Sequence, residues 1–353
     1  MESLTGGQTK ITTARLALLF FLFVLISWGL GYPVLNRYDP RQTPGLPDVK
    51  AYAALVTGTV GADADHIRFR VLVPWLAKPF YQLAKGRDVS WDPAMFGLLA
   101  ADSLFVAATA ALIVLLGTRQ LGSYTVSLVA SLLYLLNFAV SNLRLVGLVD
   151  AGEGFFLLAL LWALCERKQW ALPVIGALGA MTKESFIPFS MAFTAAWWLA
   201  VRRGSRSPLR SAAWILTTWT VSLATLIGAQ WRVGGSLVSP IHFAATLHGN
   251  HDYVQHFAWS LWDRNFWYIF LWLLPTAIPN LKQFPKSWLI PVAATSAMAF
   301  VLDGYYGGAP GTVGRALFSV AGPLLSLSSA MLLLGVSGRN LDNQGAFNQI
   351  GQG

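Results

Sequence analysis

The chain is poor in cysteine and in charge, and it lacks the common catalytic motifs. Cysteine occurs once, at Cys165, so no disulfide can form within the chain and no cysteine-rich metal site exists. Charged residues make up only 12% of the sequence, against about 25% in ordinary soluble domains. No phosphate-binding P-loop, Gly-x-Ser-x-Gly elbow, His-Glu-x-x-His zinc motif or internal repeat is present. These absences exclude an ordinary soluble domain and several common enzyme classes.

Hydrophobic residues dominate what remains. They form 55% of the chain, and the mean hydropathy is +0.53. A membrane-crossing helix needs about 20 mostly apolar residues, and this length predicts an all-α polytopic transmembrane helix bundle of about ten spans. The expected spans are 14–32, 94–117, 122–140, 152–165, 169–182, 185–201, 211–231, 265–280, 287–302 and 314–336. We therefore expect one integral membrane domain over 1–336, followed by a disordered cytoplasmic tail over 337–353.

The basic residues of the short loops predict the orientation, because Lys and Arg beside spans are retained in the cytoplasm. When alternate loops are assigned to the cytoplasm, these loops and the two terminal segments contain Lys10, Arg15, Arg119, Arg167, Lys168, Arg202, Arg203, Arg206, Arg210, Lys282, Lys286 and Arg339. Both termini are therefore expected in the cytoplasm of a bacterial plasma membrane. Because this topology explains most of the net charge of +9, a nucleic-acid partner is not expected.

A long polar segment, 33–92, is then the first extracytoplasmic loop, and 232–264 is the second large outer loop. The first loop holds six of the sixteen acidic residues: Asp39, Asp48, Asp63, Asp65, Asp88 and Asp92. Loops held by a rigid scaffold are common places for functional sites. Asp48 follows a Pro-rich turn and is expected to cap a helix. The segment 67–84 alternates basic, aromatic and apolar residues, which predicts a helix lying in the membrane interface.

Charged residues at the outer ends of other spans are expected to face the same compartment. They are Asp150, Glu153, Lys183, Glu184 and Arg315. A charged group in or beside a span costs several kcal/mol unless it is paired or hydrated, so such residues mark candidate sites. The simpler alternative is that these residues pair with one another across the bundle without binding a substrate.

Two groups of residues could bind a metal. Asp63 and Asp65 form an Asp-x-Asp pair, whose oxygen ligands suit Mg²⁺ or Mn²⁺, although a solvated turn after Gly61 is the simpler explanation. In the second outer loop, His248, His251, Asp252 and His256 have the spacing of one helical face. No other pattern in the sequence supports this second set.

Four short motifs resemble bacterial GT-C glycosyltransferases. They are Pro47-Asp48-x-x-x-Tyr52, Phe69-Arg70-Val-Leu-Val-Pro74-Trp-Leu, Thr182-Lys183-Glu184-Ser185 and Gly314-Arg315-Ala-Leu. The resemblance covers the first outer loop well, and the rest of the chain matches only in short, separate segments. It implies a polytopic enzyme that takes a sugar from a polyprenyl-phosphate carrier on the outer face, with an acid of the first outer loop as base. Asp48 matches that acid best, and Asp39 is the alternative.

The resemblance also implies roles for the other candidates. Cationic side chains suit a lipid-phosphate leaving group, which makes Arg70, Lys183 and Arg315 candidate phosphate ligands. Asp150, Glu153 and Glu184 would hold sugar hydroxyls or orient the bases. The first loop adds Tyr52, His66 and Arg68 as candidate substrate-binding residues. The acceptor would be a glycan, a lipid or a protein. A transporter or flippase of a lipid-linked or anionic solute, or a noncatalytic subunit of a membrane complex, remains the alternative.

Overall fold

The computed structural model describes residues 11–37, 47–59, 67–87, 90–204, 207–234, 253–306 and 312–335. Within these ranges the chain is helical and contains no β-strand, which confirms the predicted all-α class. The elements are α1 (Thr13–Arg37), α2 (Pro47–Thr57), α3 (Leu72–Ala84), α4 (Pro93–Leu121), α5 (Tyr124–Leu135), η2 (Val140–Arg144), α6 (Asp150–Cys165), η3 (Gln169–Ala171), α7 (Leu172–Ala180), α8 (Phe186–Val201), α9 (Pro208–Gly234), α11 (Tyr253–Trp262), α12 (Arg264–Phe270), α13 (Leu273–Leu281), α14 (Lys286–Tyr306) and α15 (Thr312–Leu333).

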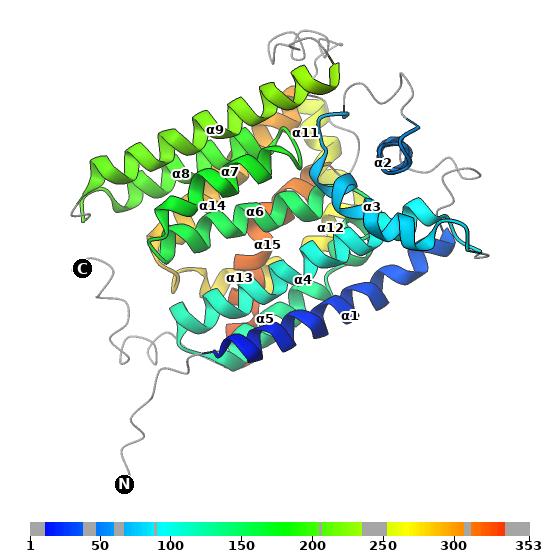
Figure 1. The fold of residues 1–353 in the computed structure, drawn as a ribbon. Coiled ribbons are helices and arrows are strands. Elements are labelled where there is room, and N and C mark those ends of the chain that lie inside the picture. The colour runs from blue at the N-terminus through cyan, green and yellow to red at the C-terminus, as the bar shows by residue number, and fades with distance from the viewer. Residues whose placement is uncertain are drawn as a thin grey trace.

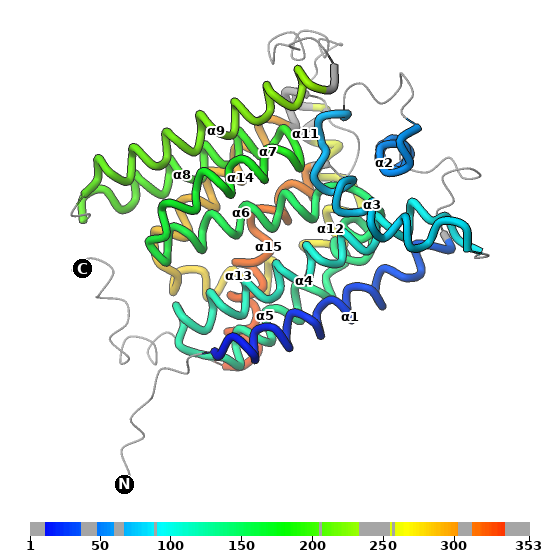
Figure 2. Tube along the Cα trace, in the orientation of Figure 1, coloured from blue at the N-terminus to red at the C-terminus, as the bar shows by residue number. Residues whose placement is uncertain are grey.

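The long helices lie side by side, and their connections gather at two ends of the bundle (Figure 1). At one end Arg15 of α1 stacks on Tyr124 of α5, and Arg119 of α4 pairs with Glu166 after α6. We call this the basic end. At the other end lie α2, α3 and the first residues of α6 and α15, as the tube in Figure 2 also shows. We call this the site end.

Helix α4 forms the centre of the bundle. It packs against α1, α3, α5 and α6, and most of its side chains are buried. Its start is fixed by Asp92, whose carboxylate accepts backbone N–H groups of Ala94 at 2.8 Å and Met95 at 3.1 Å. Such a cap satisfies amide groups that have no partner in the first helical turn. Asp92 therefore has a structural role at the end of the polar segment 33–92.

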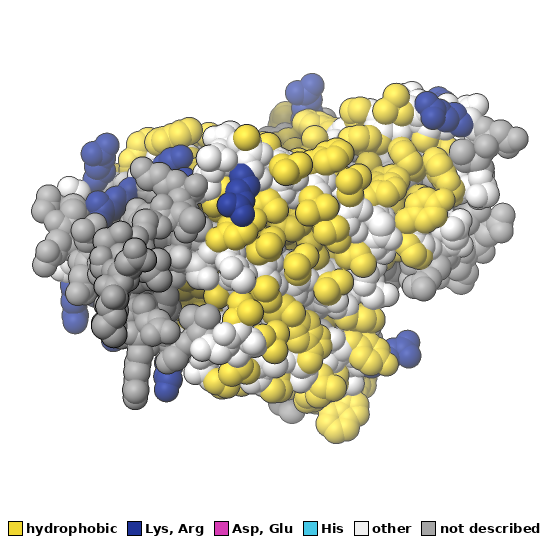
Figure 3. Space-filling view, turned by 90° about the horizontal axis from the view of Figure 1, so that it is seen from below, with side chains coloured by type: hydrophobic (Ala, Val, Ile, Leu, Met, Phe, Trp, Pro, Cys, Tyr) yellow, Lys and Arg dark blue, Asp and Glu magenta, His cyan; other side chains and the backbone are white. Residues whose placement is uncertain are grey.

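Four helices are long and apolar enough to cross a membrane: Thr13–Asn36, Pro93–Leu121, Pro208–Arg232 and Val313–Leu333. Shorter apolar helices cover Tyr124–Leu135, Gln169–Ala180, Phe186–Val201 and Lys286–Leu302. About three quarters of the spans in α4 and α15 are buried in the protein, against a third or less in α1 and α9, so α1 and α9 lie at the edge. One side of the bundle presents a broad apolar surface (Figure 3). These helices indicate a membrane protein.

Several expected boundaries were wrong. The expected span 265–280 is broken at Leu271 into α12 and α13, because Pro275 has no N–H to donate to the Leu271 carbonyl. The expected interfacial helix 67–84 begins only at Leu72, after a turn over 67–69.

The polar segment predicted over 33–92 also starts later than expected. Helix α1 continues to Arg37 instead of ending at 32. Helix α2 begins at Pro47, so Asp48 lies in its first turn and is not the residue that caps it. Proline is well suited to the first helical position, because the N–H it lacks would be unpaired there.

Candidate functional site

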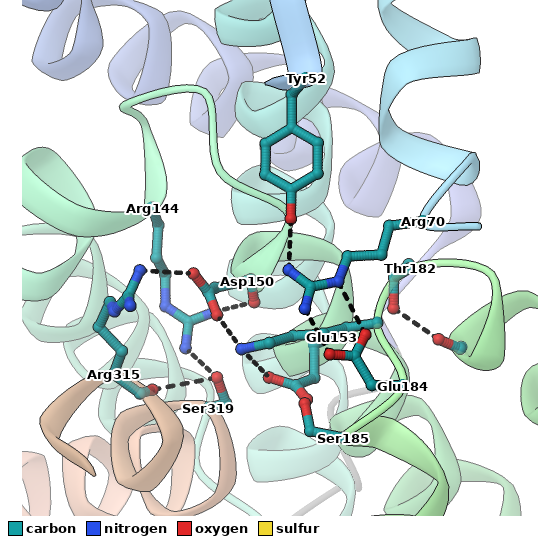
Figure 4. A network of polar contacts seen from close by, with 12 residues as sticks. Tyr52, Arg70, Arg144, Asp150, Glu153, Thr182, Glu184, Ser185, Arg315 and Ser319 are labelled. Carbon is teal, nitrogen blue, oxygen red and sulfur yellow. Dashed lines mark hydrogen bonds and ion pairs between the residues drawn. The ribbon is translucent and has the colours of Figure 1, made fainter. Parts of the chain in front are cut away.

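Seven of the predicted site residues meet at the site end in one network of hydrogen bonds and ion pairs (Figure 4). They are Tyr52, Arg70, Asp150, Glu153, Lys183, Glu184 and Arg315. Arg68 lies two residues before Arg70 and is partly buried. Outside the described residues lie Asp39, Asp63, Asp65 and His66, and likewise His248, His251 and Asp252. The structure therefore describes neither predicted metal set as a group.

One half of the network is centred on Arg70, which precedes α3. Its Nη1 donates to the Tyr52 hydroxyl at 2.6 Å, and its Nε donates to Glu184 Oε2 at 2.7 Å. Its Nη2 donates to the other oxygen of Glu184, which makes the pair bidentate. A planar guanidinium suits this two-bond geometry, which a lysine cannot reproduce. Arg70 thereby ties α2 to the turn between α7 and α8.

The other half is centred on Asp150, the first residue of α6. Lys183 Nζ donates to Asp150 Oδ1 at 2.7 Å, and Arg315 Nη1 lies 3.4 Å from Oδ2. Lys183 Nζ is also 3.8 Å from Glu153 Oε2, while Ser185 donates to Glu153 Oε1. Within the turn 182–185, Lys183 therefore contacts α6 and Glu184 contacts Arg70. This turn joins the two halves of the network.

Arg144 completes the network, and the sequence reasoning did not select it. It ends the π-helical turn η2 and is buried. Its Nη1 donates to the Asp150 carbonyl and its Nη2 to Ser319 Oγ, both at 2.7 Å. The available signal was a single arginine inside an apolar run, but hydropathy did not show that residues 140–149 fold into the bundle. Four cationic and three acidic side chains therefore meet here: Arg70, Arg144, Lys183, Arg315, Asp150, Glu153 and Glu184.

Asp102 is a second residue that the sequence reasoning missed. It lies inside α4 and is fully buried. Its Oδ2 accepts the backbone N–H of Gly147 at 3.2 Å, and Oδ1 has no hydrogen-bond partner among the described residues. Gly147 has φ of +83°, a conformation that glycine adopts without strain. Asp102 therefore holds the turn between Arg144 and Asp150. An acidic residue inside an expected span was the signal that could have identified it.

Gly154, near the start of α6, makes room for Arg144. A methyl group on Gly154 would lie 2.5 Å from Arg144 Nη1. We expect Gly154→Ala to displace Arg144 from the Asp150 carbonyl and to cost about 1–3 kcal/mol, the usual range for overpacking or for a lost hydrogen bond to a charged group. Thermal unfolding in detergent measures the change. Gly228→Ala in α9 is the control, because nothing lies within 4 Å of its added methyl group. A Gly154 variant as stable as this control would contradict the prediction.

Asp48 lies one helical turn before Tyr52, so the two side chains share a face of α2. It is partly exposed. Burial raises the pKa of Tyr52 to about 12 although Arg70 acts in the opposite direction, and the charge of Asp48 adds a smaller increase. Tyr52 therefore stays protonated at neutral pH. Asp48 is thus a carboxylate at the border of the network, and it makes no ion pair with the other described residues.

The residues of the turn 182–185 keep their charges. Burial disfavours the charged form of Lys183, but Asp150 and Glu153 outweigh burial and raise its pKa. Burial likewise opposes ionisation of Glu184, yet the facing Arg70 lowers its pKa overall. Among the described residues no group of three or more His, Cys, Asp or Glu side chains could hold a metal ion. The charged cations of the site are suited to bind an anion, and its carboxylates are suited to accept hydrogen bonds from hydroxyl groups.

Comparison with protein-family models, with curated proteins and with solved structures finds no match to this chain.

Proposed function

We propose that this protein is a membrane glycosyltransferase that transfers a sugar from a polyprenyl-phosphate-linked donor to a glycan, lipid or protein acceptor on the extracytoplasmic face. The observation that carries the proposal is the position of Asp48. This carboxylate lies one helical turn from Tyr52, whose hydroxyl contacts Arg70 at 2.6 Å in the ionic network. A base and a set of cations therefore share one end of the bundle.

The chemistry of glycosyl transfer needs both kinds of group. The transition state resembles an oxocarbenium ion, and a carboxylate can take the proton of the attacking hydroxyl. The departing lipid phosphate carries negative charge, which charge-assisted hydrogen bonds from Arg and Lys stabilise. We assign Asp48 as the base and Arg70, Lys183 and Arg315 as phosphate ligands. Each of these cations is now paired with a carboxylate, so a phosphate would replace part of that pairing.

Helix α3 offers a path for the prenyl chain. It begins two residues after Arg70 and packs against α4 through its buried side chains. Its opposite face exposes Trp75, Leu76 and Leu83. Exposed apolar side chains beside a charged site suit a ligand with a lipid tail and an anionic head. The proposal includes the finer topology, a GT-C-like bundle of about ten spans in a bacterial plasma membrane with both termini in the cytoplasm.

A transporter or flippase for a lipid-linked or anionic solute is the second candidate, and Asp102 favours it. An ionisable side chain buried within a span commonly marks a path for ions or protons. Asp102 is fully buried within α4, and its Oδ1 lacks a hydrogen-bond partner among the described residues. The two candidates differ in whether the bond between sugar and phosphate breaks.

The test uses the full chain reconstituted in liposomes with a synthetic polyprenyl-phosphate donor labelled on the sugar. Delipidated bacterial envelope material supplies the acceptors. Label appearing in the acceptor fraction, with release of polyprenyl phosphate, is the expected result. Movement of intact donor across the bilayer without release of polyprenyl phosphate would support the transporter and contradict the transferase. Empty liposomes are the control.

A further inference from the structure

Five exposed basic side chains gather at the basic end, opposite the candidate site. They are Arg167, Lys168, Arg202, Arg203 and Arg210, and we call them the basic cluster. Two hydrogen bonds bring their three loops together. Gln169 Nε2 donates to Ser211 Oγ at 2.7 Å, and Trp198 Nε1 donates to the Pro208 carbonyl at 3.1 Å. The turn after α6, the end of α8 and the start of α9 therefore form one surface.

Negative charge is scarce on this surface. Among the described residues of the three loops, Glu166 is the one acid, and it is bonded to Arg119 of α4. Because opposite charges attract over about 8 Å at physiological salt, a surface with this excess of positive charge favours an anionic partner.

The backbone at Arg167 has an unfavourable conformation. Arg167 has φ of +56°, and it is the one described residue other than glycine with positive φ. Its N–H bonds to the Leu164 carbonyl, and the N–H of Lys168 bonds to the Ala163 carbonyl. These two bonds form a Schellman motif, whose left-handed position is usually a glycine. A side chain kept at such a position is a feature that functional sites often retain at a cost in stability.

Apolar side chains border the basic cluster. Trp170 is 65% exposed and Leu209 is 82% exposed. Lys168 lies 4.8 Å from the centre of the Trp162 ring, and Arg202 lies 5.3 Å from that of Trp198. Helix α9, which begins within this surface at Pro208, is long and apolar enough to cross a membrane. A membrane crossed by α9 would place the cluster at the depth of lipid headgroups, where aromatic and basic side chains are typically found together.

We propose that the basic cluster binds the headgroups of anionic phospholipids. Retention of Lys and Arg in the cytoplasm during insertion explains basic loops one at a time. It does not explain why three loops are bonded together, or why an arginine occupies a glycine position. Binding of an anionic headgroup explains both features. Several cations must lie close together to bind one phosphate, which requires the three loops to be joined and places a cation at position 167. This site is separate from the network at the site end and does not depend on the proposed transferase activity.

The test measures lipid binding to the purified full chain in neutral detergent. Phosphatidylglycerol and phosphatidylcholine with the same acyl chains are the probes, and native mass spectrometry and the thermal midpoint are the readouts. We expect phosphatidylglycerol to bind more tightly and to raise the midpoint more. The triple variant Arg202→Gln, Arg203→Gln, Arg210→Gln should weaken phosphatidylglycerol binding by at least about tenfold, since each base near an anionic surface contributes about 1 kcal/mol. Equal binding of the two lipids by the wild type, or unchanged binding by the variant, would overturn the proposal.

A matched control removes three exposed bases from the site end: Lys85→Gln, Arg87→Gln and Arg264→Gln. This variant has the same net charge as the first and should keep more of the preference for phosphatidylglycerol. An equal loss in both variants would show that net charge alone attracts the lipid and would overturn the assignment to the cluster. Arg167→Gly should weaken binding without lowering the midpoint, because glycine adopts the left-handed conformation without strain. A less stable Arg167 variant that binds lipid like the wild type would remove Arg167 from the cluster.

Discussion

Asp48→Asn is expected to lower the rate of sugar transfer by about 10²–10⁴-fold, the usual contribution of a positioned general base. Asparagine has nearly the same size and keeps a side-chain oxygen, but it cannot take a proton. The side chain is partly exposed in the first turn of α2 and makes no ion pair with the other described residues, so its neutralisation should leave the fold intact. Initial rates of sugar transfer at saturating donor measure the effect, with the thermal midpoint as the check on folding.

The matched control is Asp92→Asn, in the same polar segment 33–92. Asp92 accepts two backbone N–H groups at the start of α4, and asparagine caps helices about as well as aspartate. This variant makes the same chemical change at an acid that has a structural role. Transfer by Asp48→Asn at the rate of the wild type would show that Asp48 is not the base. Asp39 would then be the next acid to replace.

Asp150→Asn is expected to destabilise the protein by about 3–5 kcal/mol, because removing one partner of a buried ion pair leaves the other charge without compensation. Asp150 is 3% exposed, and its two oxygens contact Lys183 and Arg315 from different parts of the chain. An amide keeps the shape but removes the charge that both cations face. Chemical or thermal unfolding in detergent, followed by tryptophan fluorescence, measures the loss.

A double-mutant cycle separates the ion pair from other effects of the substitution. Lys183→Met removes the closest cation, and Asp150→Asn combined with Lys183→Met removes both charges of the 2.7 Å pair. The double variant should lose less stability than the sum of the two single variants, since neither then leaves its partner unpaired. Additive losses would mean that the pair does not contribute as a unit and that Arg315 provides the main countercharge of Asp150.

The two ends of the bundle were largely predictable from the sequence. Assigning the connections between expected spans alternately to the two sides of the membrane placed five residues on one side, and the structure brings these five together. They are Arg70, Asp150, Lys183, Glu184 and Arg315. The prediction worked because the chain reverses its direction after each crossing of the bundle, so every second connection lies at the same end. It did not need the helix boundaries to be right, and the break between α12 and α13 left it unaffected.

The pairing within the site was not predictable in this way. Glu184 and Lys183 are neighbours in sequence, yet Glu184 turns to Arg70 and Lys183 turns to Asp150. Arg144 and Asp102 were missed because the prediction considered charges in the outer loops and at the outer ends of spans, and neither residue was assigned there. Their roles depend on the turn 145–149, whose path is set by Gly147 and by the packing of α6 against α4.

The sequence by itself determined that the chain is helical and apolar, and that its charges separate into a basic end and a mixed end. These properties follow from hydropathy and from charge counts near spans, which are local. Only the tertiary structure decided which cation faces which carboxylate, that Arg144 reaches the Asp150 carbonyl past Gly154, and that Arg167 holds a glycine conformation. Those facts depend on how each helix is rotated and how closely it packs against helices distant in sequence. No pattern within a single segment records them.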